Sequence, residues 1–396
     1  MYVKNSGFIK LPLLLVLLIW GACRDTPTQK MALSESPRVS TAITALPKTV
    51  KAPKNNVSSE EKVRLGQLLF FDPILSGGKD VACATCHHPQ HGYAEFRDIS
   101  IGPNAHGLGS KRKFNKENDI PFVKRNSQTI INAAFNGIDT YKRYDPEKAP
   151  MFWDDRVKSL EDQALEPIKA FEEMRGHGFA EREILEIVLL RLKNIPEYQE
   201  LFEQAFNEEN AVTIQNLAKA IATFERTLVT NNSRFDLYMR GEQNAILLSE
   251  KEGFELFKKV GCVNCHNGPM FSDYKPHVMG VPQNRKLPVP DAGIQDSFKF
   301  RTPTLRNLRF TAPYMHNGSL PTLKQVLEFY EDISNGKERN ALVPKEKYDP
   351  FVRELNLSVK EMSLIISFLN TLNDDAFSTA IPDAVPSGLS VGGNIR

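Results

Sequence analysis

Two copies of one short cysteine pattern constrain this chain more than any other feature. Residues 83–87 have the sequence CATCH and residues 262–266 have the sequence CVNCH, so both share the spacing Cys-x-x-Cys-His. Two thiols on one helical turn can form thioethers with the two vinyl groups of one porphyrin, and the adjoining imidazole can then bind the iron. The pattern predicts two covalently bound haem c groups. The expected attachment and ligand residues are Cys83, Cys86, His87, Cys262, Cys265 and His266.

Other uses of cysteine pairs fit this pattern less well. A zinc site would combine the two pairs, and it would not need a histidine directly after both of them. A thioredoxin-like redox site would need a βαβ context, which the sequence does not indicate. Haem attachment is therefore the preferred interpretation.

Length and composition are those of an ordinary globular protein. The 396 residues are enough for two domains, and 41% are apolar while 25% are charged. The formal net charge is only +2 and no long basic run is present. These values argue against a nucleic-acid partner.

The N-terminus has the pattern of an export signal. Lys4 and Lys10 precede an apolar run at residues 11–20, and small residues follow it. The run is shorter than the roughly 20 residues that a membrane-spanning helix needs. We therefore expect a signal peptide over residues 1–22 and a periplasmic protein.

Cys23 directly follows Gly-Ala, as in a bacterial lipobox. The other four cysteines belong to the two haem motifs, so Cys23 would be a free thiol in an oxidising compartment unless it is modified. We expect a lipid anchor on Cys23, which would be the only membrane contact. Trp20 departs from the lipobox pattern, and a plain signal peptide with an incidental cysteine is the alternative.

The arrangement of motifs indicates two related domains. A short similarity between residues 66–70 (GQLLF) and 253–257 (GFELF) precedes the two cysteine motifs. The segment before the first helix is rich in Thr, Ser, Pro and Lys, which is typical of a flexible tether. The expected parts are a signal peptide at 1–22, a tether at 23–57, an N-terminal haem domain at 58–240, a C-terminal haem domain at 241–375 and a tail at 376–396.

Helical patterns dominate the secondary structure that the sequence predicts. Ser58, Ser249 and Ser358 each have a glutamate three residues later, which is a capping pattern for the start of a helix. Apolar residues recur at helical spacing through 160–240, whereas strand-like alternation is scarce. We expect a mostly α fold with two cytochrome-c-like haem domains and long irregular loops.

Four longer stretches carry a family resemblance. They are FWDDR at 152–156, LEDQA at 160–164, RTPTLRN at 301–307 and TAPYMHNG at 311–318. With these stretches, in this order around the cysteine motifs, the chain resembles the bacterial di-haem cytochrome c peroxidase/MauG family from about residue 58 to 375. The resemblance implies an enzyme of the cytochrome c peroxidase type. Such an enzyme reduces hydrogen peroxide to water with electrons from a small exported cytochrome c or cupredoxin.

The resemblance also assigns different roles to the two haems. The N-terminal haem on His87 would be peroxidatic, with Gln163, Pro167 and Glu173 on its distal side, and the C-terminal haem would transfer electrons. Peroxide cleavage needs a group that takes a proton from the inner oxygen and returns it to the leaving oxygen. A carboxylate in a partly apolar pocket can do this. Glu173 occupies the position of the family's catalytic glutamate, and Glu172 is the competing choice.

Trp153 resembles the tryptophan that lies between the haems in this family. An indole in that position can relay an electron or a hole between the two porphyrins. The alternative is an ordinary core aromatic residue, which is the usual role of tryptophan.

The sixth ligand of the C-terminal iron separates the branches of the family. Conventional members use a methionine, whereas MauG-like members use a tyrosine. Tyr330 stands at the corresponding position of this chain, and a phenolate would stabilise the higher oxidation states of iron. Met279 and Met315 are the alternatives, and Tyr330 would then be a core aromatic residue.

The resemblance further implies a calcium ion between the haems. Its ligands would be the Asn126 side chain and the backbone carbonyls of Thr311 and Pro313, an oxygen-only set that suits a hard cation. His106 lies in the loop that supplies a resting-state ligand to the peroxidatic iron in some members. We favour an ordinary loop residue at this position.

Two other functions stay open at this point. A MauG-like oxidase would draw electrons from residues of a partner protein, which would then be its substrate. A non-catalytic di-haem electron carrier would have two permanently six-coordinate irons.

Overall fold

A computed structural model of the chain describes residues 42–354 and 357–396, which belong to one compact unit. Most of the regular structure is helical, and long irregular segments connect the helices. The predicted fold class, a mostly α protein with irregular loops, is therefore confirmed. None of the described helices is long and apolar enough to cross a membrane. The predicted signal peptide and Cys23 lie outside the described residues.

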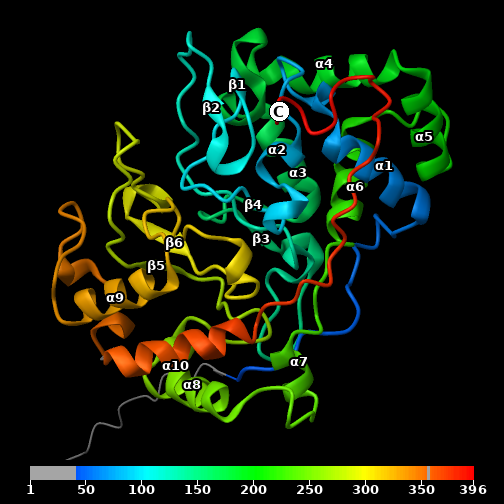
Figure 1. Cartoon of the computed structure of the whole chain (residues 1–396). Helices are drawn as coiled ribbons and strands as arrows, with labels where there is room; N and C mark the ends of the chain where they lie inside the picture. The colour runs from blue at the N-terminus through cyan, green and yellow to red at the C-terminus, as the bar shows by residue number, and fades with distance from the viewer. Residues whose placement is uncertain (1–41, 355–356) are drawn as a thin grey trace, which may run out of the picture. The chain divides into compact units, whose positions relative to one another are not determined.

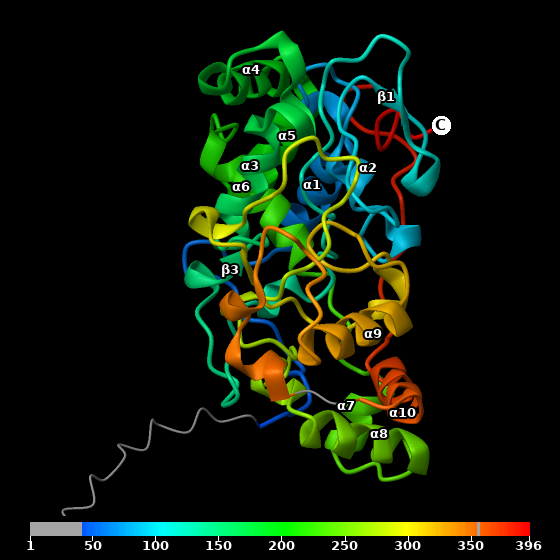
Figure 2. The same ribbon diagram turned by 90° about the vertical axis from the view of Figure 1, so that its left-hand side faces the viewer.

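Five helices of the N-terminal half pack around one apolar core (Figures 1 and 2). At the contact of the first and last of these helices, a Cβ on Gly66 would lie only 2.0 Å from the Ala220 carbonyl oxygen. A larger residue would therefore force the two helices apart. The five helices are α1 (Glu60–Phe71), α3 (Leu160–Lys169), α4 (Glu181–Lys193), α5 (Pro196–Phe206) and α6 (Ile214–Glu225).

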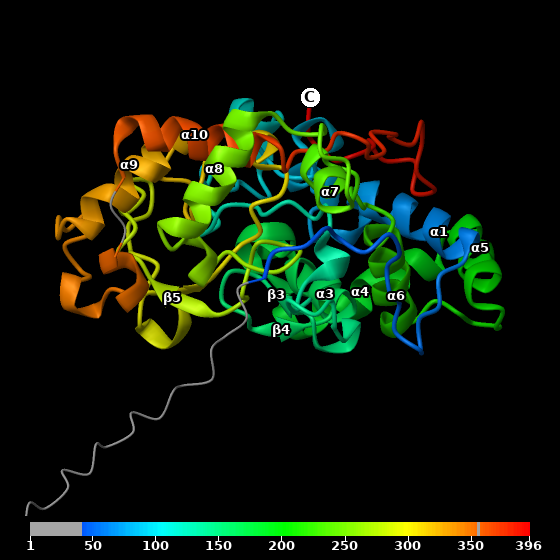
Figure 3. The same cartoon turned by 90° about the horizontal axis from the view of Figure 1, so that it is seen from below.

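The C-terminal half uses the same device in a second helix pair. Helices α8 (Leu248–Lys259) and α10 (Val359–Asn370) lie side by side (Figure 3). A Cβ on Gly253 would lie 2.1 Å from the Leu364 carbonyl oxygen. The short sequence similarity around Gly66 and Gly253 thus corresponds to two close helix contacts. The other helices of this half are α7 (Arg234–Met239) and α9 (Leu323–Ser334).

The strands are short and form three antiparallel ribbons, each with two strands. They do not form a common sheet, and they fix the ends of the long loops. The pairs are β1 (Ala105–His106) with β2 (Lys113–Phe114), β3 (Pro150–Met151) with β4 (Val157–Lys158), and β5 (Pro276–Val278) with β6 (Lys299–Arg301).

The segment before α1 is packed over its described part, so the predicted tether is wrong for these residues. Ile43 and Leu46 are buried, and Asn56 is completely buried. The Leu46 amide donates a hydrogen bond of 2.9 Å to an Asp236 carboxylate oxygen. Apolar side chains and a satisfied backbone hold this segment without regular secondary structure.

The predicted tail is also part of the folded body. After α10 the chain runs back across α6 and α1 toward the first cysteine motif (Figure 1). Val385 is buried in the cluster that contains Phe70 and Phe71. The Gly392 amide donates to the Phe71 carbonyl at 2.7 Å. The last residues of the chain therefore complete the N-terminal half.

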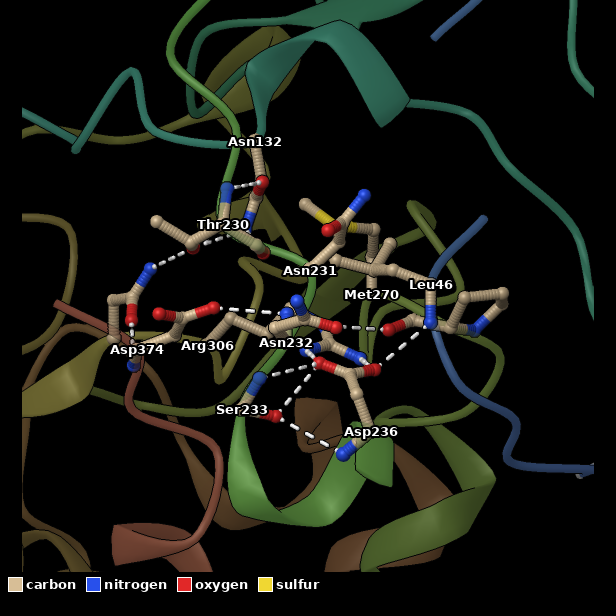
Figure 4. Close-up of polar contacts among 12 residues, drawn as sticks. Leu46, Asn132, Thr230, Asn231, Asn232, Ser233, Asp236, Met270, Arg306 and Asp374 are labelled. Carbon is tan, nitrogen blue, oxygen red and sulfur yellow. Dashed lines mark hydrogen bonds and ion pairs between the residues drawn. The ribbon is translucent and has the colours of Figure 1, made fainter. Parts of the chain in front are cut away.

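A buried ion pair joins several parts of the C-terminal half (Figure 4). The Arg306 guanidinium donates two hydrogen bonds to Asp236, at 2.8 and 2.9 Å, and both side chains are almost inaccessible. Asp236 also accepts hydrogen bonds from Leu46 and from the backbone and hydroxyl of Ser233. Burial raises the pKa of the Asp236 carboxyl, but Arg306 outweighs burial and holds the pKa below its usual value.

We expect Asp236→Ala to lower the free energy of unfolding by about 3–5 kcal/mol, because it leaves the buried Arg306 charge without a partner. Urea unfolding of the haem-loaded protein, followed by circular dichroism, measures this loss. Asp375→Ala is the matched control, because it breaks an exposed pair with Arg309 that should contribute less than about 1 kcal/mol. Equal losses in the two variants would contradict the importance of the buried pair.

Candidate functional site

The first cysteine motif forms the short helix α2 (Cys83–Cys86), and His87 ends it. The His87 imidazole contacts the Tyr93 carbonyl oxygen through Nδ1, at 3.1 Å. A carbonyl oxygen only accepts, so Nδ1 carries the proton and Nε2 is the nitrogen that can bind a metal. Burial lowers the pKa of His87, which favours the neutral imidazole that an iron ligand requires.

The second motif repeats this arrangement on a short 3-10 helix, Cys262–Asn264. His266 Nδ1 lies 2.9 Å from the Phe271 carbonyl oxygen, and burial lowers the pKa of this imidazole as well. Tyr93 and Phe271 both have a φ of +53°, an unusual backbone conformation for an aromatic residue. Both sites therefore aim the histidine with the carbonyl group of an aromatic residue in the same strained conformation.

The four cysteines of the motifs are free thiols rather than disulfides. Burial raises the pKa of the Cys83 and Cys262 thiols to about 12. Each pair is half-buried next to a histidine whose Nδ1 is held by a backbone carbonyl. These features fit covalent haem at both motifs.

A cavity of about 250 Å³ adjoins the second motif. It is lined by Cys262, Cys265 and His266, and the sixth-ligand candidates Tyr330, Met279 and Met315 also line it. Burial raises the pKa of Tyr330 above its usual value. Among the described residues, its hydroxyl has no hydrogen-bond partner. A cavity with apolar walls and one unpartnered phenol fits a haem that His266 would hold. His87 would hold the other haem, at the first motif. The apolar walls include Phe257, Val326, Leu327, Val352, Ile365 and Leu369.

The three residues predicted for the distal side of the first haem lie close together in the chain. Gln163 and Pro167 are on α3, and Glu173 is on the π-helix Phe171–Arg175 that follows. The buried Oε1 atom of Gln163 has no hydrogen-bond partner. Burial raises the pKa of Glu173 to about 7, and neighbouring acidic groups add to the rise while Arg156 opposes it. Burial raises the pKa of the Cys86 thiol, and the charges of Glu95 and Glu173 add to the rise.

Trp153 lies in the wall of the cavity beside the second motif. Its indole N–H donates to the Asn126 carbonyl oxygen at 2.9 Å, and its own carbonyl accepts from the Arg301 amide at 2.8 Å. These bonds tie the FWDDR stretch to the RTPTLRN stretch and fix the plane of the indole.

The three residues predicted for calcium, Asn126, Thr311 and Pro313, all line this cavity. The Asn126 amide nitrogen donates to the carbonyl oxygens of Arg97 and Asp98, at 2.8 and 3.2 Å. These hydrogen bonds use the amide nitrogen of Asn126, and its amide oxygen is the atom that would bind calcium.

His106 is exposed, and its Nδ1 lies 2.8 Å from the Asn115 amide oxygen. Its loop is held by the buried guanidinium of Arg112, which donates to the carbonyls of Ile101, Gly102 and Gly107. In this conformation His106 belongs to the surface of the loop.

Sequence reasoning missed His316 as a residue of the site. It is 5% exposed and stacks on Phe300, with ring centroids 3.6 Å apart, while its other edge faces Trp153 at 6.5 Å. Burial lowers the pKa of His316 to about 3, so the imidazole is neutral. The signal was present, because His316 lies inside the TAPYMHNG stretch that carried the resemblance.

Family models and known proteins match most of this chain. A family model described as di-haem cytochrome c peroxidase matches residues 60–244, and one described as RoxA-like, cytochrome c-like matches residues 300–332. The methylamine utilization protein MauG of Methylorubrum extorquens is 34% identical over 341 residues, which cover 85% of each chain. The cytochrome c551 peroxidase of Nitrosomonas europaea is 33% identical over 335 residues, which cover 83% of this chain and 84% of the relative.

A solved structure gives the same result for the fold. A MauG-like protein associated with microbial copper homeostasis matches with a TM-score of 0.66 at 26% identity, covering 83% of this chain and 95% of that one. Two haem-binding motifs on a mostly helical fold define a di-haem c-type cytochrome. More narrowly, the chain belongs to the di-haem cytochrome c peroxidase/MauG family and is an oxidoreductase of the peroxidase type.

We expect the intact mature protein to carry two covalent haems, because both motifs present paired thiols and a histidine whose Nδ1 is held by a backbone carbonyl. Mass spectrometry after export from a host that attaches haem c measures this number. The double variant Cys83→Ser with Cys86→Ser should lose one haem and keep the other. Loss of no haem in this variant would contradict attachment at the first motif.

Proposed function

We propose that this protein reduces hydrogen peroxide to water at the N-terminal haem, with electrons from a small exported cytochrome c or cupredoxin. Two electrons and two protons convert one peroxide into two water molecules. A haem bound at His87 would supply the redox chemistry of O–O cleavage. The observation that carries the proposal is Glu173, a carboxyl whose pKa burial raises to about 7 and whose charge acts on the Cys86 thiol of the first motif.

Glu173 serves as the proton-transfer group in this proposal. Its carboxylate accepts the proton of the inner peroxide oxygen, and the resulting acid returns the proton to the outer oxygen, which leaves as water. A pKa near 7 suits both steps, because neither protonation state is then strongly disfavoured. Gln163 orients the peroxide through its unpartnered amide oxygen, and Pro167 adds an apolar wall that excludes water.

In this proposal the C-terminal half would hold a haem that supplies electrons for the reaction. His266 and Tyr330 would bind its iron, and Trp153 would relay charge toward the N-terminal site. The common cavity of these three residues supports the assignment. A calcium ion held by Asn126 and the carbonyls of Thr311 and Pro313 would fix the loops between the two sites.

We further propose the parts of the chain as a signal peptide at 1–22, an N-terminal peroxidatic domain at 58–240 and a C-terminal electron-transfer domain at 241–375. Export to the periplasm and a lipid anchor on Cys23 complete this proposal. The anchor would keep the enzyme at a membrane surface, where its electron donors diffuse.

The second candidate function is a MauG-like oxidation of residues in a partner protein. Tyr330 in the C-terminal cavity favours it, because an anionic oxygen ligand stabilises oxidised iron. Relatives named MauG support it as well. Turnover of peroxide with a reduced cytochrome supports the first function, and covalent change in a partner protein supports the second.

Glu173→Gln should keep both haems and reduce peroxide turnover by roughly a hundredfold or more, because the amide cannot accept a proton. In the unmodified protein, the rate at low peroxide should fall as the pH falls through about 7, since the protonated carboxyl cannot act as a base. Stopped-flow absorption measures both effects. Glu172→Gln is the matched control. An inactive Glu172→Gln beside an active Glu173→Gln would assign the proton transfer to Glu172.

Tyr330→Phe should remove the oxygen ligand while leaving the packing of the ring nearly intact. We expect the electron paramagnetic resonance signal of the C-terminal ferric haem to change and its reduction potential to rise, because an anionic donor is lost. Both haems should remain attached. Unchanged spectra and potentials would exclude Tyr330 and would leave Met279 and Met315 as the ligand candidates.

A further inference from the structure

The end of the chain contacts the residues that surround His87. We propose that residues 377–394, here called the C-terminal brace, hold the proximal ligand of the N-terminal haem in position. Tyr93 and Thr85 are the positioning residues that transmit this effect. The inference rests on the proposed function, since it concerns the haem that we assign to peroxide reduction.

Tyr93 connects the brace directly to His87. Its carbonyl oxygen accepts the proton of His87 Nδ1, while its hydroxyl donates to the Ser378 carbonyl at 2.8 Å. The Phe377 ring packs against the Tyr93 ring edge to face, at 6.1 Å. Because the φ of Tyr93 is +53°, contacts elsewhere must hold it in this conformation. The brace supplies such contacts at the far end of the side chain.

Thr85 connects the brace to the cysteine motif itself. It lies between the two cysteines and is completely buried. Its hydroxyl donates to the Gly392 carbonyl at 2.8 Å and accepts from the Ala82 amide at 2.9 Å. One hydroxyl group thus joins the first turn of α2 to the end of the chain.

Further hydrogen bonds tie the brace to the segment before the first cysteine motif. The Gly392 amide donates to the Phe71 carbonyl, and the Asn394 amide donates to the Asp80 carbonyl at 2.9 Å. The Ser387 hydroxyl donates to Asp72 at 2.7 Å. Phe71, Asp72 and Asp80 all precede the first cysteine motif. The brace therefore has a defined register beside α2.

The brace also reaches the distal side of the same site through Arg112. This guanidinium donates to the Asn394 carbonyl at 2.9 Å and to the Gly102 carbonyl at 2.7 Å. A Cβ on Gly102 would lie 2.2 Å from the Glu172 carbonyl oxygen and 2.5 Å from that of Glu173. The backbone that carries Glu173 is thus supported by a loop that Arg112 connects to the brace.

Two glycines of the brace provide a matched test. Both have left-handed backbone conformations, with a φ of +78° at Gly393 and +70° at Gly388. A Cβ at Gly393 would lie 2.5 Å from the Asp80 carbonyl oxygen, whereas a Cβ at Gly388 would meet nothing within 4 Å. Gly393→Ala therefore displaces the brace from residues 80–81, and Gly388→Ala reproduces only the backbone strain.

The experiment compares both variants as full-length proteins with two haems. Hydrogen exchange reports the brace, and resonance Raman spectra with redox titration report each haem. We expect Gly393→Ala to speed exchange in 377–394, to shift the iron–histidine frequency and the potential of the N-terminal haem alone, and to reduce peroxide turnover about tenfold. Gly388→Ala should match the unmodified protein in all of these. Faster exchange in Gly393→Ala with an unchanged N-terminal haem would overturn the proposal.

A chain that ends at Ser387 provides the second test if Gly393→Ala leaves the exchange unchanged. It lacks the partners of Thr85 and Arg112, while the contact between Tyr93 and Ser378 remains. A changed or lost N-terminal haem beside an intact C-terminal haem supports the proposal. Loss of both haems, or two unchanged haems, overturns it. A single haem in the unmodified protein would instead refute the proposed function.

Discussion

The ion pair between Arg306 and Asp236 joins parts of the chain that are far apart in the sequence. Asp236 lies in α7, and Arg306 belongs to the loop that lines the C-terminal cavity. The Leu46 amide, in the segment before the first helix, donates to Asp236. Neighbouring Asn307 extends the network to Thr230 and to the amide of Asp374. A charge removed from water is tolerated only when its partners are all present. The wall of the cavity and the packing of the chain ends therefore form together.

The two haem sites share their proximal construction and differ in what surrounds it. At each site a half-buried imidazole donates to the carbonyl of an aromatic residue with positive φ, so the same tautomer results. The difference lies in the other residues of each site. The first site has Glu173, whose pKa is raised, and the second has Tyr330, Met279 and Met315 in an apolar cavity. Because the histidines are held alike, the roles that we propose for the two haems rest on the other residues of each site.

Local patterns predicted those features that depend on neighbouring residues. The cysteine motifs lie as expected, and Ser358 with Glu361 starts α10. The start of α1 shifts by one residue, because the hydroxyl of Ser59 rather than Ser58 accepts from the Lys62 amide. The packing of residues 42–57 and 376–396 could not be predicted, since it depends on distant partners and on no local periodicity. For the same reason Glu173 and Tyr330 could be predicted only through the family resemblance, and no role was predicted for Thr85, Tyr93 or His316.

The return of the C-terminal segment has a consequence for biogenesis. A chain that leaves a translocation pore presents its N-terminal half first, and domains generally fold as they emerge. Here that half lacks its last packing partners until Val385, Gly392 and Asn394 have followed. The thiols of Cys83 and Cys86 remain near an incomplete surface during this interval. In the exported protein that we propose, these thiols would be open to haem attachment before residues 385–394 pack beside α2.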